Sequence, residues 1–520
     1  MNSPQVSSRA RRVALLIAAA LGFAALPAGS VIGPASAPRV ERIANAVTEI
    51  DLAAAEKLLA EADSESPALA FERARLAVYR GDCDAALATL ASPTLAETRE
   101  GGRLKELADG CAKATVAGFV VEDRGRGIWL RIQDDADRAL APYLFEVAAR
   151  ARDAVSAQVG VDLPRPLRID LVRDLFSLSA VSGLPLTAAE TTGTLAVARW
   201  GRVIMLSPRA AQLGFPWEDT LAHEIAHLVV TRATRDHAPL WLQEGMAKRL
   251  ESSWRAERPF DEPGWANALA WRALHDGRSV GIDRLGPSIA MLPTPEAASI
   301  AFAEVTSFVE YFVREAGEPA LKLLFADLRQ TGQNGADVAL RSVTGYTLSE
   351  WNDRWQRALA AQPAPDGVAA AHRAPPRDLA RRVRLSDLLY ARGHVGAAAD
   401  EIGPAITPEL RDPSLRHRAG RALLAAGQPE KADAALGTLT EIATLHGAWF
   451  ALHGRRLRET GKPGEAEAAF GVAVSVDPLS EDVACEGEHR HPGRPASETK
   501  LPERPERREL CRAARERRRD

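Results

Sequence analysis

The sequence LAHEIAHLVVTRATRDHAPLWLQEGMA occupies residues 221–247 of a 520-residue chain. Within it, His223, Glu224 and His227 form the pattern His-Glu-x-x-His, and on a helix the two histidines stand on one face, where they can bind one metal ion. Glu224 follows the first histidine, so its carboxylate can take a proton from a water that a zinc ion has acidified to a pKa of about 7. The opposite side of this helix is apolar and is expected to anchor it in the core: Leu221, Ile225 and Leu228.

A catalytic zinc ion usually has three protein ligands and one open position, so the two histidines need a third partner. Glu244 supplies it on a second predicted helix, and Pro239 suits the first turn of that helix. Gly245 is expected to let this helix approach the first one closely. The second helix also has an apolar packing face, formed by Trp241, Leu242, Met246, Ala247 and Leu250. These residues predict one Zn²⁺ per chain.

The pattern Trp-Leu-x-Glu-Gly-x-Ala at 241–247 resembles the third-ligand helix of gluzincin zinc metallopeptidases, a clan MA group with many smaller peptidase MA-like domains. The resemblance implies that His223, His227 and Glu244 bind zinc and that Glu224 is the general base. Two features differ from the aminopeptidase N type: slightly fewer residues separate His227 from Glu244, and no Gly-x-Met-Glu-Asn segment lies upstream. An aminopeptidase activity is therefore not implied. Chance residues on two amphipathic helices are the alternative interpretation.

Upstream of the motif, alternating patterns predict an α+β entry to the metallopeptidase domain. Strands are expected at 119–121, 128–132 and 167–172, with a helix at 136–159. Residues 192–206 predict a β-hairpin just before the helix of the histidines. In gluzincin-like domains the edge strand at this place lines the cleft and pairs with an extended substrate, so the resemblance implies that role here. A purely structural hairpin is the alternative.

Downstream of the motif the chain is expected to be mainly helical, which gives a gluzincin-like domain over 116–361 with a mixed sheet and a helical half. Peptide hydrolysis usually needs a donor for the oxyanion besides the metal, often tyrosine or histidine in this clan. Tyr311 and His237 are the candidates for this donor. Phe302 falls where similar domains tend to have a tyrosine, and its ring cannot donate a hydrogen bond.

All-α repeats are predicted on both sides of this domain. Residues 38–115 contain paired amphipathic segments around Gly81 and resemble a degenerate tetratricopeptide unit. After a linker at 362–378, residues 379–480 repeat with a period of thirty-four, the tetratricopeptide period. Two series of small residues mark the repeat: Gly393, Gly427 and Gly461, and Ala398, Ala432 and Ala466. The stacked repeats would present a concave face that binds a peptide or protein partner, or would serve only as a stabilising cap.

Both ends of the chain carry further signals. Residues 1–37 have the pattern of a bacterial-type signal peptide, with arginines before an apolar run at 13–26 and a small-residue cleavage site at 35–37. Cleavage near Ala28 and an uncleaved N-terminal anchor are the alternatives. The run is shorter than the roughly 20 residues of a membrane span, so no stable span is expected after signal removal. Residues 481–520 are charged and are expected to be disordered unless a disulfide holds them.

Four cysteines fall into two local pairs, Cys83 with Cys111 and Cys485 with Cys511. Because an exported protein meets an oxidising compartment, two disulfides are expected, and free buried thiols are the alternative. The segment between Cys83 and Cys111 is short and resembles a helical hairpin, so this pairing is predicted specifically.

The composition argues against one class of function, nucleic-acid binding. With 26% charged residues and a formal net charge of −3, the chain gives no indication of nucleic-acid binding. The leading hypothesis is a periplasmic or secreted zinc-dependent peptidase, in which Glu224 is the base and the helical repeats recruit a peptide or protein substrate or a protein partner. The alternative is a metal-bound, non-catalytic scaffold whose repeats bind protein partners.

Overall fold

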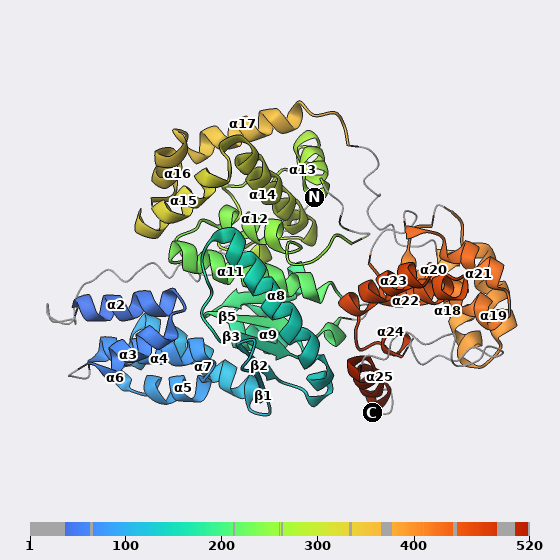
Figure 1. Ribbon diagram of the computed structural model, residues 1–520, viewed down its shortest axis with the longest axis horizontal. Coiled ribbons are helices and arrows are strands. Elements are labelled where there is room, and N and C mark those ends of the chain that lie inside the picture. Colours follow the sequence, from blue (N-terminus) through green and yellow to red (C-terminus); the bar gives the residue numbers. More distant parts are fainter. Residues whose placement is uncertain are drawn as a thin grey trace, which may run out of the picture.

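The computed structural model describes residues 37–62, 66–211, 214–258, 261, 264–331, 335–365, 377–408, 410–439, 445–485 and 505–517. The expected signal peptide lies outside these residues except for Ala37, and most of the expected linker at 362–378 lies outside them as well. Figure 1 shows the helices that precede the sheet (blue) and the C-terminal helices (orange to red) at opposite ends of the molecule. The sheet and a further group of helices lie between them.

The described strands form one mixed sheet in the order β1-β2-β3-β5-β4. They are β1 (Phe119–Asp123), β2 (Ile128–Ile132), β3 (Leu167–Val172), β4 (Ala196–Arg199) and β5 (Arg202–Leu206). The three inner strands run parallel, and each edge strand is antiparallel to its neighbour. The inner strands are almost fully buried, as expected for parallel strands covered on both faces. The prediction of a mixed sheet is confirmed.

The β4–β5 hairpin is present but shorter than predicted. Its turn consists of Trp200 and Gly201, whose positive φ angles of 56° and 65° are those of a tight type I′ hairpin. Residues 192–195 do not belong to the strand, because Thr192 ends the helix α10 (Leu186–Thr192) and Gly193 caps it in the left-handed conformation.

The helix expected at 136–159 starts later as an α-helix. It begins with a 3-10 turn, η1 (Asp135–Leu140), and continues as α8 (Ala141–Val159). Pro142 explains the change, because proline lacks a backbone N–H and suits only the first turn of an α-helix. α8 packs against α11 (Trp217–Thr234), the helix of the two histidines.

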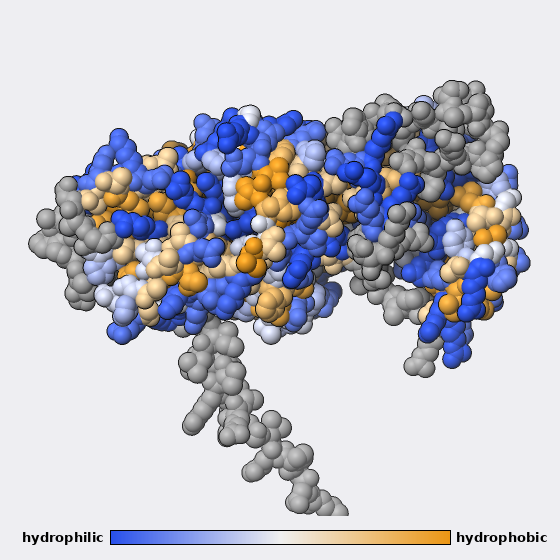
Figure 2. Space-filling model, turned by 90° about the horizontal axis from the view of Figure 1, so that it is seen from below, coloured by the Kyte–Doolittle hydropathy of each residue, from blue (hydrophilic) through white to orange (hydrophobic). Residues whose placement is uncertain are grey.

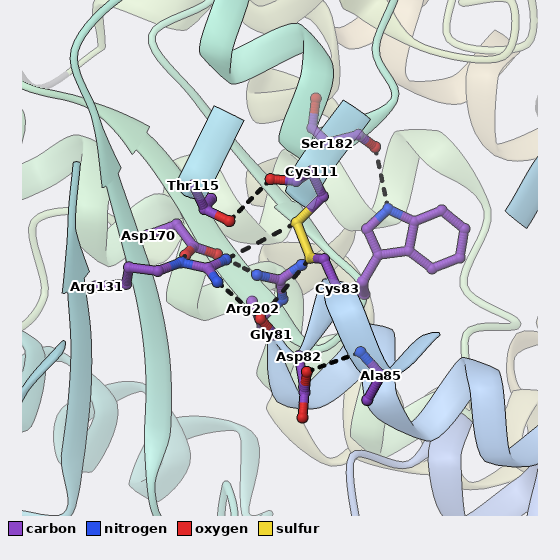
Figure 3. Close-up of a disulfide and its surroundings, with 11 residues drawn as sticks. Gly81, Asp82, Cys83, Ala85, Cys111, Thr115, Arg131, Asp170, Ser182 and Arg202 are labelled. Atoms are coloured by element: carbon purple, nitrogen blue, oxygen red, sulfur yellow. Dashed lines mark hydrogen bonds and ion pairs between the residues drawn. A yellow bond between two sulfur atoms is a disulfide. The ribbon is translucent and has the colours of Figure 1, made fainter. Parts of the chain in front are cut away.

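The described helices before the sheet are joined to it beside a disulfide. These helices are α2 (Ala37–Thr48), α3 (Leu52–Ala60), α4 (Pro67–Arg80), α5 (Cys83–Leu90), α6 (Pro93–Ala96) and α7 (Arg99–Thr115). Cys83 is bonded to Cys111, which confirms the predicted pairing. Figure 3 shows that Arg131 and Arg202 both pair with Asp170 next to this disulfide.

This buried charge cluster ties the turn at Gly81 to the sheet. Nη1 of Arg131 donates to the carbonyl oxygen of Gly81 at 2.7 Å, while its Nε lies 2.6 Å from Oδ1 of Asp170. Burial lowers the pKa of Arg202 to about 10, although Asp170 opposes the shift. The N-terminal helices are therefore held to β2 and β3 by polar contacts as well as by apolar packing.

The helical half follows α11 and surrounds one long apolar helix, α14. Phe308 and Phe312 of α14 are fully buried, and α14 packs against both α12 and α13. The elements are α12 (Leu240–Leu250), α13 (Trp265–His275), η3 (Ile289–Met291), α14 (Pro295–Ala316), α15 (Glu318–Thr331), α16 (Ala336–Thr344) and α17 (Leu348–Ala360). Two further short elements lie before α11 in the sequence: α9 (Leu175–Ser182) and η2 (Pro208–Ala210).

Three helical hairpins account for the thirty-four-residue period. They pair α18 (Arg377–Ala391) with α19 (Val395–Ile402), α20 (Pro413–Ala425) with α21 (Pro429–Leu436), and α22 (Gly447–Glu459) with α23 (Pro463–Val476), and η5 (Gly403–Ala405) follows α19. The repeated glycines have positive φ in the turns, and the repeated alanines are fully buried: Gly393, Gly427 and Gly461, and Ala398, Ala432 and Ala466. The assignment to the tetratricopeptide family stays a prediction.

The last hairpin is docked on the start of α11. Nε1 of Trp217 donates to the carbonyl oxygen of Val474 at 3.1 Å, and the backbone N–H of Phe215 donates to Val476 at 2.9 Å. Trp217 is fully buried. The C-terminal hairpins are therefore in direct contact with the helix of the histidines.

Part of the expected disordered tail, 481–520, is a helix. α24 (Glu481–Ala484) leads to Cys485, which is bonded to Cys511 in α25 (Pro505–Arg517), so the second expected disulfide is confirmed. Leu510 and Ala514 of α25 are buried in the main core, where α25 contacts η1. The remaining tail residues lie outside the described part of the chain.

The visible surface is mixed in character. Viewed from below, hydrophobic residues lie in several separate patches among hydrophilic ones (Figure 2). Among the described helices, none combines the length and the apolar character that a membrane crossing requires.

Candidate metal centre

The two histidines lie on a helix that is anchored on its other side. Leu221, Ile225 and Leu228 are buried as predicted, so α11 has a fixed orientation against the sheet and α8. α11 ends at Thr234, and the chain turns back through two residues of positive φ, Arg235 and Asp236, before α12 begins after Pro239. The return brings Glu244 of α12 to the face of α11 that carries His223 and His227.

The three predicted ligands converge with the spacing of a tetrahedral zinc site. The Nε2 atoms of His223 and His227 are 3.2 Å apart, and Oε2 of Glu244 lies 3.6 Å from the first and 3.4 Å from the second. Tetrahedral ligands at about 2.0–2.1 Å from zinc would stand about 3.3 Å from one another. The donor set and its spacing therefore fit one zinc ion and leave a fourth position open. In the described part of the chain, this is the only such group of three side chains.

Each histidine is oriented by a further side chain, one from α12 and one from the residue that caps its C-terminus. Nδ1 of His223 lies 3.1 Å from Oε2 of Glu251, and Nδ1 of His227 lies 3.2 Å from Oε1 of Gln243. An oxygen acceptor at Nδ1 leaves Nε2 free to bind a metal ion. Neither partner was predicted from the sequence, although Glu251 lies seven residues after Glu244 and so returns to the same face of the helix.

The surrounding carboxylates favour positive charge at this site. Burial lowers the pKa of His223, but Glu244 and Glu251 outweigh that effect and raise it to about 9. Burial raises the pKa of Glu244, yet His227 and His223 hold it well below its usual range. The cluster therefore attracts cations, and a divalent ion satisfies the same electrostatic demand.

Glu224 lies between the histidines and the edge strand. Its side chain is buried, and burial raises its pKa against the opposing charges of His227 and His223. The backbone amide of Ala198 in β4 faces this carboxylate and lowers its pKa, against the effect of burial. β4 is the edge of the described sheet next to α11, so the predicted base stands beside an open strand edge.

Gly245 has a different neighbour from the one expected. A Cβ atom at this position would lie 2.5 Å from Cγ2 of Val309 and 2.7 Å from the carbonyl oxygen of Val305. The close approach is therefore between α12 and α14, and the prediction that Gly245 admits α11 is wrong. The glycine still positions Glu244, because it lets α12 lie against the central helix of the helical half.

Phe302, which cannot donate to an oxyanion, contacts the predicted ligand His223, whereas the two candidate donors Tyr311 and His237 have other partners. The ring of Phe302 packs edge-to-face on His223 with centroids 6.2 Å apart. Tyr311 instead packs on Trp351, and Nδ1 of His237 lies 3.0 Å from the carbonyl oxygen of Leu328.

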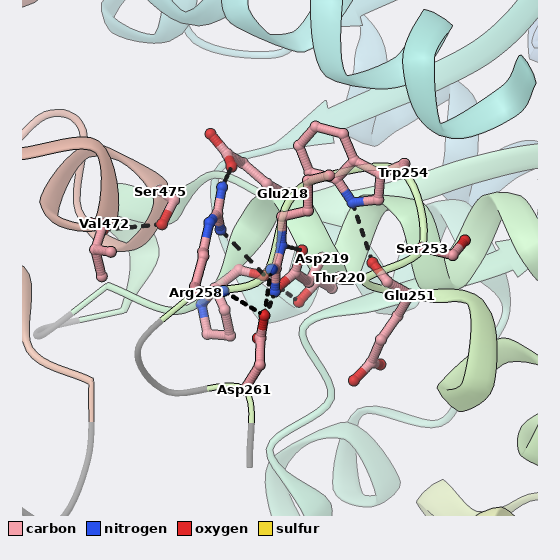
Figure 4. Close-up of polar contacts among 12 residues, drawn as sticks. Glu218, Asp219, Thr220, Glu251, Ser253, Trp254, Arg258, Asp261, Val472 and Ser475 are labelled. Atoms are coloured by element: carbon pink, nitrogen blue, oxygen red, sulfur yellow. Dashed lines mark hydrogen bonds and ion pairs between the residues drawn. The ribbon is translucent and has the colours of Figure 1, made fainter. Parts of the chain in front are cut away.

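The start of α11 is clamped to the segment after α12. Arg255 bonds both carboxylate oxygens of Asp219, at 2.7 and 2.6 Å, and Arg258 pairs with Glu218. Asp261 accepts from Arg255 and from the backbone N–H of Arg258, as Figure 4 shows for the residues around Arg258. These contacts fix the two helices that carry the predicted ligands relative to each other.

Residues 153–361 match the family model of the Peptidase MA superfamily. The match begins within α8 and includes α11, α12 and all three converging side chains. No curated protein and no solved structure matches the chain. This part of the chain is therefore similar to the peptidase domains of that superfamily.

Proposed function

We propose that the protein is a zinc-dependent peptidase of gluzincin type. The observation that carries the proposal is the convergence of His223, His227 and Glu244, with ligand atoms 3.2 to 3.6 Å apart, next to the buried carboxylate of Glu224. A site that only binds metal needs the three ligands but has no use for this carboxylate. The Peptidase MA match over the same residues supports the reaction class.

Zinc, when bound, would acidify a water molecule and polarise the scissile carbonyl. Glu224 takes a proton from this water while the oxygen of the water bonds to the carbonyl carbon. The π electrons of the carbonyl group move to the carbonyl oxygen. When the carbon–nitrogen bond breaks, those electrons return, and Glu224 passes the proton to the leaving amine. The products are a carboxylate and an amine.

The edge strand β4 would hold the substrate. Its residues, Ala196–Arg199, pair with β5 on one side, and Ala198 contacts the base. An extended peptide can add to such an edge through main-chain hydrogen bonds, which places a peptide bond beside Glu224.

We further propose that the protein acts after export and that the C-terminal hairpins recruit a protein substrate or partner. The two disulfides support export, because such bonds persist in oxidising compartments. Docking of α23 on α11 supports recruitment close to the site.

The test is Glu224→Gln, which keeps the shape of the side chain and removes the base. Cleavage of a diverse peptide library should fall by about 10²- to 10⁴-fold, because that is the usual contribution of general acid–base catalysis. Zinc content should stay at one ion per chain. The control is Glu310→Gln, a partly buried glutamate of α14, which should leave cleavage unchanged.

A non-catalytic scaffold is the second candidate, because Phe302, Tyr311 and His237 supply no evident oxyanion donor. Zinc-loaded wild-type protein that cleaves nothing in the library, while it still binds a partner through the hairpins, would decide for the scaffold.

A further inference from the structure

The face of α12 that carries Glu244 also carries a cation. Lys248 follows Glu244 by four residues and Glu251 follows it by seven, so all three side chains lie on one stripe of the helix. Nζ of Lys248 lies 3.1 and 3.0 Å from the two carboxylate oxygens of Glu251, and one of these oxygens contacts His223. The ammonium is therefore separated by a single carboxylate from an imidazole that would bind the metal.

Two aromatic rings flank this ammonium. Nζ lies 5.5 Å from the ring centroid of Phe302 and 5.8 Å from that of Trp265, within the range of cation–π contacts. Phe302 in turn packs on His223. The positive charge thus lies against the ring at the position where the resemblance to gluzincins places a donor hydroxyl.

The side chain of Lys248 is partly exposed to solvent. The exposed fraction of its side chain is 24%, equal to that of Glu251. A lysine ammonium has three donors on a flexible four-carbon stem, so it can leave one contact for another without movement of the helix. Glu251 would keep its contact with His223 during such a shift.

We propose that Lys248 is the oxyanion donor of this site, an assignment that rests on the proposed peptidase function. As the water attacks, Lys248 donates a hydrogen bond to the carbonyl oxygen, where negative charge develops, and it stays protonated throughout. It replaces the hydroxyl that Phe302 lacks.

The experiment compares Lys248→Met and Lys248→Arg with Arg249→Met. Arg249 is the matched control, because it is the next cation on α12 and pairs with Glu318 of α15 instead, at 2.6 Å. The substrate is a cleaved library peptide that is acetylated and amidated and has no acidic residue. A phosphinic peptide of the same sequence, whose tetrahedral anion imitates the intermediate, gives a second measurement by calorimetry.

Lys248→Met should lower kcat by about 10²- to 10³-fold, as expected for the loss of one oxyanion donor, with KM and zinc content unchanged. Affinity for the phosphinic peptide should fall with kcat, while binding of the substrate itself, measured in the Glu224→Gln background, should not change. Lys248→Arg should restore part of kcat, and Arg249→Met should behave as wild type.

Three results would overturn the assignment. Unchanged kcat and phosphinic affinity in Lys248→Met would show that another group is the donor. Loss of zinc would show that Lys248 only supports Glu251, and a defect limited to peptides with a carboxylate would show that it binds substrate anions. An inactive wild type would overturn the proposed function instead, so the two failures are distinguishable.

Discussion

Two pairs of histidines lie in different parts of the molecule, and three of these four residues are buried while His227 is partly exposed. His223 and His227 are on α11 with ring centroids 4.8 Å apart, and the carboxylates of Glu244 and Glu251 face them. Each imidazole has an oxygen partner at Nδ1, and its Nε2 lies near both Glu244 and the other histidine. This pair is surrounded by groups that favour positive charge.

The second pair, His417 and His446, lies in the C-terminal hairpins with ring centroids 5.9 Å apart. Both side chains are buried and border a cavity of about 580 Å³. Arg418 and Arg421 line the same cavity, where both pair with Asp387, at 3.0 and 3.7 Å. Here arginines as well as aspartates surround the histidines, and the arginines lower the pKa of His417.

The comparison shows that the neighbouring charges decide whether the effect of burial on the pKa of a histidine is reversed or reinforced. Burial lowers the pKa in both places, but carboxylates reverse the shift at His223, to about 9, whereas arginines add to it at His417, to about 3. A metal centre needs the first environment, because a dication can take the place of the protons that the carboxylates would otherwise hold on the imidazoles. The second environment keeps its imidazoles neutral.

The largest expected effect comes from removal of the carboxylate that distinguishes the first pair. Glu244→Gln replaces an anionic ligand by a neutral amide, so zinc affinity should fall by about 100-fold or more. This exceeds the loss of about 10- to 100-fold that is typical when a residue that only hydrogen-bonds to a ligand is replaced. Competition with a chelating dye measures the loss. Glu318→Gln, an exposed glutamate on α15, is the control. Unchanged affinity in Glu244→Gln would remove Glu244 from the ligand set.

A smaller loss of zinc affinity is expected from Glu251, which contacts His223 and not the metal position. Glu251→Gln keeps the size of the side chain but weakens the acceptor at Nδ1 of His223, so zinc affinity should fall by about 10- to 100-fold. The same dye competition applies, and X-ray absorption should still show two histidine ligands. A loss as large as that of Glu244→Gln would mean that Glu251 itself binds the metal.

The convergence of the ligands could be predicted because two short motifs fix it. A helix places His223 and His227 on one face whatever surrounds them, and Pro239 and the apolar pattern after it indicate where the second helix begins. The neighbours of these helices could not be predicted in the same way. Gly245 faces α14 because of how the helical half packs, and that packing depends on residues far away in the sequence.

The errors in the fold also have local causes. The stretch 192–195 has the composition of a strand, but Gly193 ends a helix there. α25 is so rich in arginine and glutamate that disorder was expected, yet Leu510 and Ala514 give it a short apolar row that the core and the Cys485–Cys511 bond hold in place. A row this short has no clear signal in a charged segment.

The last prediction concerns the second histidine pair and the pH dependence of stability. In the unfolded chain a histidine has a pKa of about 6.5, whereas burial first, and then His446, Arg421 and Arg418, lower the pKa of His417 to about 3 in the folded protein. Above about pH 6.5 both states are neutral and His417 has no effect. As the pH falls from there toward 3, only the unfolded state binds the proton, so the hairpins lose stability.

At pH 5.5 this loss should be about 1.4 kcal/mol relative to pH 7.5 for His417 alone, since one pH unit below the unfolded pKa corresponds to about 1.4 kcal/mol. Protection factors from hydrogen exchange of α20 and α22 measure it, because they divide out the intrinsic pH dependence of exchange. His417→Gln should flatten the slope even if it changes the absolute stability, while replacement of the exposed His275 of α13 should leave the slope as it is. Equal slopes in wild type and His417→Gln would show that His417 is not kept neutral by its neighbours, and the contrast between the two pairs would then lie in the carboxylates alone.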